Sequence, residues 1–167
     1  MIKIIRIIFL FLCVLIFSST YVTAQSKQAA IASAHPLATQ VGINILRQGG
    51  NAFDAAAAIT ASLAVVEPYS SGLGGGAFWL IHRSSDNKQV MIDGREKAPM
   101  RSTHDMYLDK AGDVVEGLSL NGPKAAGIPG VPAGIEHLVK NYGRLSLKQV
   151  LMPAIKQAQR GFIVSER

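Results

Sequence analysis

The sequence is poor in cysteine and in charge, and both shortages limit what the protein can do. Cys13 is its only cysteine, so no internal disulfide can form, and the chain beyond it has neither a thiol nucleophile nor a thiolate ligand for zinc. Charged residues make up 17%, and no basic run is interleaved with aromatic residues. These patterns argue against a nucleic-acid-binding surface.

The first 24 residues are organised differently from the rest. Lys3 and Arg6 form a basic start, residues 7–17 are an unbroken apolar run, and residues 22–24 (VTA) are a small-residue cleavage site. This order predicts a secretory signal peptide, residues 1–24, that is cut after Ala24 and directs residues 25–167 to the periplasm or the medium. The alternative is a retained membrane anchor, which usually needs about 20 apolar residues.

The mature chain begins with signals for a short strand and two helices. Residues 28–34 (QAAIASA) predict a short buried strand, and Pro36 suits the first turn of a helix that ends at Gly49 and Gly50. Asn51 is a good N-cap for a second helix, residues 52–66, with Asp54 placed to complete a capping box. This helix is almost entirely apolar, so we expect it to be buried on most sides, within something larger.

The remaining pattern adds a hairpin, a long loop and two more helices. Residues 77–81 and 89–92 predict two strands joined by a turn at 84–87, and residues 97–120 predict a loop. Helices are expected over residues 133–142 and 147–159, the second with a proline inside it. The order of these elements indicates an α+β fold.

Two features stand out as candidate sites. The glycine cluster at residues 72–76 (GLGGG) follows a helix and precedes a strand, the reverse of the order in a phosphate cradle, and a tight packing contact is the alternative. Arg95 follows the second strand in residues 93–96 (DGRE). It is either a carboxylate-binding residue or a surface arginine paired with Asp93 or Glu96.

The histidines suggest no metal site and no catalytic triad. His35, His82, His104 and His137 lie too far apart in sequence to form a ligand pattern. Thr103 precedes His104, but neighbouring residues point in different directions, so adjacency does not activate the hydroxyl.

Short segments occur in a specific order and spacing over nearly the whole mature chain: residues 49–56 (GGNAFDAA), 72–78 (GLGGGAF), 93–99 (DGREKAP), 130–134 (GVPAG), 142–143 (YG) and 158–164 (AQRGFIV). No segment is decisive alone. Taken together, the ordered set resembles the gamma-glutamyltransferase (gamma-glutamyltranspeptidase, glutathione hydrolase) family.

The resemblance implies an N-terminal-nucleophile hydrolase with an α-β-β-α sandwich, of which residues 25–167 hold only the N-terminal portion of the large subunit. In this family a precursor cleaves itself into large and small subunits, and a new N-terminal threonine attacks the gamma-glutamyl bond of glutathione or a related compound. Glutamate then passes to water, an amino acid or a peptide, without a cofactor or metal. By its place in the segment 93–99, Arg95 is expected to bind the α-carboxylate, while the glycine cluster is expected to serve packing.

The sequence also departs from the family pattern. The nucleophilic threonine occurs in a Thr-Thr-His context that these 167 residues lack, so we expect this stretch alone to show neither self-cleavage nor turnover. Related activities remain open, namely an acylase of the cephalosporin type or a transpeptidase acting on poly-gamma-glutamate. A non-catalytic exported domain is a further alternative; it would fold alone, whereas a fragment should expose apolar surface.

Overall fold

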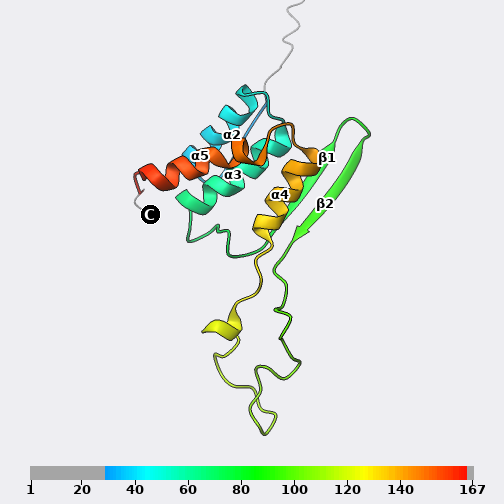
Figure 1. The fold of residues 1–167 in the computed structure, drawn as a ribbon, viewed down its shortest axis with the longest axis vertical. Coiled ribbons are helices and arrows are strands. Elements are labelled where there is room, and N and C mark those ends of the chain that lie inside the picture. Colours follow the sequence, from blue (N-terminus) through cyan, green and yellow to red (C-terminus); the bar gives the residue numbers. More distant parts are fainter. Residues whose placement is uncertain (1–28, 165–167) are drawn as a thin grey trace, which may run out of the picture. The chain divides into compact units, whose positions relative to one another are not determined.

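The computed structural model describes residues 29–164, and every helix and strand in it lies in one compact unit that starts at Ile31. Within residues 29–164, the structure has four α-helices, one antiparallel hairpin and a short 3-10 helix (Figure 1). The α+β class is therefore confirmed. In chain order the elements are α2 (Pro36–Arg47), α3 (Ala52–Val66), β1 (Ala77–Arg83), β2 (Lys88–Gly94), η1 (Pro123–Ala125), α4 (Val131–Tyr142) and α5 (Leu147–Arg160).

Helix α2 begins and ends where its local signals predict. His35 is its N-cap, with Nδ1 accepting from the Leu37 N–H at 3.1 Å, and Pro36 occupies the first turn. Gly49 follows the helix with φ +90°, a left-handed conformation that glycine adopts at little cost. The strand predicted just before this helix is wrong over residues 29–34, which form no strand, because no segment of the described chain pairs with them.

Helix α3 is the most enclosed element of the described chain. Helices α2, α4 and α5 pack around it, and only Ala52 among its residues is exposed. Asn51 and Asp54 form the predicted capping box at its start. Its small side chains allow the neighbouring helices to approach closely, so the prediction of a helix buried on most sides is confirmed.

The hairpin pairs residue 77 with residue 94 and residue 83 with residue 88, so residues 84–87 form the predicted turn. Asn87 has φ 54°, as turn residues of its type often do. One face, with Trp79, Ile81 and Ile92, is buried. The other face leaves Phe78, Leu80 and Met91 largely exposed.

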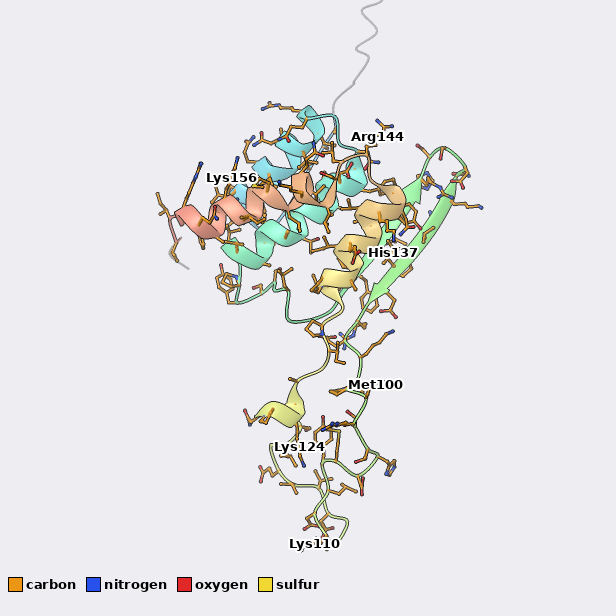
Figure 2. The ribbon with its side chains drawn as sticks, in the orientation of Figure 1. Met100, Lys110, Lys124, His137, Arg144 and Lys156 are labelled. Carbon is orange, nitrogen blue, oxygen red and sulfur yellow. The ribbon has the colours of Figure 1, made fainter. Side chains whose placement is uncertain are left out.

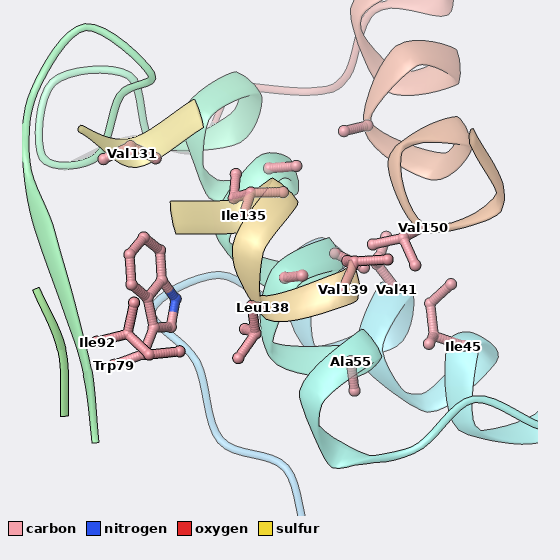
Figure 3. Close-up of a cluster of buried hydrophobic side chains, with 14 of the residues drawn as sticks. Val41, Ile45, Ala55, Trp79, Ile92, Val131, Ile135, Leu138, Val139 and Val150 are labelled. Atoms are coloured by element: carbon pink, nitrogen blue, oxygen red, sulfur yellow. The ribbon is translucent and has the colours of Figure 1, made fainter. Parts of the chain in front are cut away.

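Helix α4 covers the buried face of the hairpin (Figure 3). The indole of Trp79 packs beside Ile135 and Leu138, and its Nε1 donates to the Thr60 hydroxyl at 3.3 Å. Gly134 is required at this crossing, because a Cβ there would overlap the indole ring. The crossing fixes the hairpin against α3 and α4 and thereby places the end of β2.

The chain between β2 and α4 forms the predicted long loop, which runs away from the helices (Figure 1). A two-residue bridge closes its base, where Lys97 and Ile128 exchange backbone hydrogen bonds of 3.1 and 2.8 Å. Farther out, the Tyr107 hydroxyl donates to the Lys124 carbonyl at 2.9 Å. Met100, Lys110 and Lys124 mark the course of this loop (Figure 2).

Helix α5 forms with Pro153 inside it, as predicted, and begins with a second capping box between Ser146 and Gln149. No helix within residues 29–164 has the length and apolarity needed to cross a membrane. The predicted signal peptide and its cleavage after Ala24 lie outside the described residues and stay predictions.

Candidate substrate-binding site at the end of β2

Arg95 is the first residue after β2, where the chain leaves the hairpin for the long loop. Its backbone N–H donates to Asp93 Oδ1 at 2.9 Å, which closes a short turn and directs the chain out of the strand. The side chain is 64% exposed. The side chain is therefore accessible to a ligand, as the interpretation of Arg95 as a carboxylate-binding residue requires.

Glu96 is the neighbour that sequence reasoning considered only as an ion-pair partner. Its Oε2 lies 3.5 Å from Arg95 Nε, so the surface-pair alternative is present in the structure as a loose contact. The same oxygen is buried and accepts no hydrogen bond from any described residue. Because the Arg95 side chain is largely exposed and the separation is 3.5 Å, this contact contributes little to stability and does not account for Arg95 by itself.

The glycine cluster divides into two halves. The Gly75 carbonyl accepts from the N–H groups of Gly130 and Val131, at 3.1 and 3.2 Å, so the first N–H groups of α4 bind backbone instead of an anion. A Cβ on Gly76 would lie 2.9 Å from the Arg95 Cα. A Cβ on Gly74, in contrast, would have no neighbouring atom within 4 Å. The packing interpretation therefore holds for Gly75 and Gly76.

Arg95 stands between two hollows. One, of about 520 Å³, lies between β2 and α4, and His137 lines it from α4 (Figure 2). The other, of about 460 Å³, lies on the loop side and is lined by Thr103, Tyr107 and Lys124 among others. Asp93 and Lys97 share the first hollow with Arg95, so both signs of charge border it.

The remaining candidates do not form a second site. His35 caps α2, and His82 and His104 are exposed on the hairpin and the loop. In the part of the chain that the structure describes, no group of histidines or acids is placed to hold a metal ion. The Thr103 hydroxyl donates a hydrogen bond to the Asp105 carboxylate and lowers the pKa of that group.

Sequence reasoning missed the close approach of Gly130 to the end of β2. A Cβ on Gly130 would lie 2.5 Å from the Arg95 carbonyl oxygen and would overlap the Gly94 oxygen. The segment GVPAG gave no sign of this, because the contact joins residues 35 positions apart and depends on how α4 crosses the hairpin.

Comparisons with known proteins identify the family. The gamma-glutamyltranspeptidase family model matches residues 38–167. The glutathione hydrolase proenzyme of Escherichia coli is 45% identical over 142 residues, which are 85% of this chain and 24% of that protein. The chain thus spans about a quarter of the length of this curated relative.

Solved structures show the same relationship. The gamma-glutamyltranspeptidase of Helicobacter pylori has a TM-score of 0.77 and 46% identity, over 83% of this chain and 40% of that one. A cephalosporin acylase from Bacillus halodurans is more distant, with a TM-score of 0.68 and 34% identity over 81% of this chain and 27% of that one. On these matches, the chain belongs to the gamma-glutamyltranspeptidase family.

Proposed function

We propose that residues 25–167 are the N-terminal portion of the large subunit of a gamma-glutamyltransferase that cleaves the gamma-glutamyl bond of glutathione and related compounds. The observation that carries the proposal is Arg95, whose largely exposed side chain lies at the end of β2 beside a hollow, within the family segment 93–99. The glutamate is transferred to water, an amino acid or a peptide. The threonine nucleophile is supplied from outside these residues.

Arg95 contributes orientation. A guanidinium can donate two parallel hydrogen bonds to one carboxylate, which fixes both the position and the direction of the bound group. The α-carboxylate of a gamma-glutamyl compound takes no part in the reaction, so its binding energy serves to hold the scissile amide in place. The turn closed by Asp93 sets the point from which the side chain of Arg95 reaches this group.

The open face of the hairpin supports the proposed α-β-β-α sandwich. Helix α4 covers one face, while Phe78, Leu80 and Met91 leave the other face apolar and exposed. A second sheet layer would bury these side chains. In the proposed enzyme that layer comes with the small subunit made from the same precursor, after export to the periplasm or the medium by residues 1–24.

A hybrid proenzyme tests the role of Arg95. Residues 25–167 are joined to the part of the Escherichia coli proenzyme that follows the matched region, and the Michaelis constant is measured for gamma-glutamyl-p-nitroanilide. Arg95→Ala should raise this constant by about tenfold to a hundredfold, the usual cost of a lost charged hydrogen bond, with a smaller change in kcat. An unchanged Michaelis constant would contradict the proposal.

Two controls make the test specific. Arg47→Ala removes an exposed arginine at the end of α2 and should leave both constants unchanged. 4-Aminobutyryl-p-nitroanilide lacks the α-carboxylate, so Arg95→Ala should not alter its turnover. If the substitution impairs both donors equally, Arg95 acts on the fold and not on the carboxylate.

An acylase of the cephalosporin type is the second candidate, and the similarity to the Bacillus halodurans enzyme favours it. A glutaryl group keeps the carboxylate and lacks the α-amino group, so Arg95 suits it as well. The two are distinguished with a precursor whose downstream part comes from this protein's own gene instead of from Escherichia coli. Faster turnover of glutaryl-p-nitroanilide than of the gamma-glutamyl donor would favour the acylase.

A further inference from the structure

We infer that Gly76 and Gly130 are positioning residues for Arg95. They do not contact the substrate, but they allow two backbone segments to pack closely against the end of β2, and this packing determines the position of the guanidinium. The inference rests on the proposed carboxylate-binding role of Arg95 and adds the residues on which its precision depends.

Gly130 presses on the chain from the side of α4. Its N–H donates to the Gly75 carbonyl at 3.1 Å, and a Cβ on it would meet the carbonyl oxygens of Gly94 and Arg95. Backbone oxygens cannot rotate away as the end of a side chain can. A methyl group at residue 130 therefore has to move the Gly94–Arg95 peptide or the start of α4.

Gly76, in the glycine cluster at residues 72–76, packs against the same part of the chain. A Cβ on it would lie 2.9 Å from the Arg95 Cα and 2.5 Å from Glu96 Oε2. The Glu96 carboxylate can turn away, but the Arg95 Cα moves only with its backbone. Gly75 lies between the two contacts, because its carbonyl receives the Gly130 N–H. The two glycines thus belong to one backbone crossing around residues 94–96.

Glycine is required at both positions because neighbouring atoms leave no room for a Cβ, and not because of the backbone conformation. Gly130 has φ −96°, and Gly76 is absent from the residues with positive φ. Alanine can adopt either conformation, so a substitution acts through displacement of Arg95. Gly74 supplies a matched control in the same cluster, since it also lacks a positive φ and a Cβ there has nothing within 4 Å.

A displaced arginine should lose carboxylate recognition first. Two parallel hydrogen bonds require the guanidinium plane to face the carboxylate, and a misplacement of about 1 Å can cost about a hundredfold in rate. We expect Gly76→Ala to raise the Michaelis constant for gamma-glutamyl-p-nitroanilide about tenfold and Gly130→Ala to raise it more, because its conflict lies wholly with backbone.

The experiment uses the hybrid proenzyme and both donors. Gly76→Ala and Gly130→Ala should raise the Michaelis constant for the gamma-glutamyl donor and leave the turnover of 4-aminobutyryl-p-nitroanilide unchanged, whereas Gly74→Ala should change neither. Equal losses with both donors would assign the glycines to the fold alone and overturn the inference. So would a Michaelis constant for Gly76→Ala that equals the value for Gly74→Ala.

A second measurement on the 167-residue chain does not depend on maturation of the hybrid. The measurement is an NMR spectrum of the chain with its arginines labelled at Nε, in which the Arg95 resonance is the one that disappears in Arg95→Lys. We expect this resonance to shift in Gly76→Ala and Gly130→Ala and to stay in place in Gly74→Ala. An unmoved resonance in the first two variants overturns the inference. The proposed function is tested separately by the Michaelis constant of Arg95→Ala. That constant can stay unchanged while the glycine variants still shift the resonance, or rise while they do not, so the two tests have distinguishable outcomes.

Discussion

Asp54 and Glu96 are two carboxylates beside turns that join distant parts of the chain, and their surroundings differ. Asp54 is fully buried, and its oxygens accept from the backbone N–H groups of Asn51, Arg144 and Leu145 at 2.9, 2.9 and 3.4 Å. The Asn51 side chain adds a bond to the Tyr142 carbonyl. The start of α3 is thereby fixed to the turn between α4 and α5.

Glu96 lies at the end of β2 without such support. Its Oε2 accepts no hydrogen bond from any residue in the described part of the chain, and its nearest cation, Arg95 Nε, is 3.5 Å away. The carboxylate of Asp54 thus has backbone hydrogen-bond donors from its own chain, whereas the end of β2 is held by backbone packing and leaves Glu96 Oε2 without a hydrogen bond. Stability should therefore depend on the first region and ligand binding on the second.

The largest effect on stability is expected at Asp54. Asp54→Asn replaces one accepting oxygen with an NH₂ group, although both oxygens accept backbone N–H groups in the native chain. A buried donor without a partner costs about 1–3 kcal/mol, so we expect the free energy of unfolding to fall by about 2–3 kcal/mol in urea titrations of the full chain. A loss below about 0.5 kcal/mol would show that the corner does not depend on this carboxylate.

Glu96→Gln makes the same chemical change in the other region. Because Glu96 Oε2 accepts no hydrogen bond, the substitution removes a poorly compensated charge and should alter the free energy of unfolding by no more than about 0.5 kcal/mol. The measurement is the same urea titration. A destabilisation as large as that of Asp54→Asn would mean that the two carboxylates have equivalent structural roles.

The same contrast explains what sequence could predict. Asn51 and Asp54 predicted the start of α3 because both partners of a capping box lie within one turn. The hydrogen bonds that Asp54 accepts from the turn between α4 and α5 could not be predicted, since their donors lie 90 and 91 residues away. The predicted strand is wrong over residues 29–34 for the same reason, because a strand depends on a partner that the local pattern does not reveal.

Arg95 lies between these cases. Its place after a strand followed from the local pattern and its proposed ligand from the family segment, and the structure adds the exposed guanidinium. The contacts of Gly76 and Gly130 with its backbone depend on how the loop, the hairpin and α4 cross. A glycine-rich segment indicates that some close approach exists but not which atoms meet.

The smallest expected effect concerns Asp86, in the exposed hairpin turn. Arg83 Nε donates to Asp86 Oδ1 at 2.8 Å, and this hydrogen bond, with the charge of Arg83, lowers the pKa of Asp86 below its ordinary value of 3.8. A carboxyl group whose pKa is lowered by folding contributes stability above its unfolded pKa, and this contribution disappears as the pH falls through its folded pKa.

Asp86→Asn should therefore lower the urea midpoint slightly at neutral pH, and the difference from the native chain should vanish well below pH 3.8. Exposure limits its size, since solvent screens the pair. Asp54 provides the contrast. The decrease in urea midpoint on Asp54→Asn comes from the geometry of buried N–H donors and should be large at neutral pH. A midpoint loss for Asp86→Asn as large as that for Asp54→Asn would mean that the exposed turn, and not the buried corner, controls unfolding.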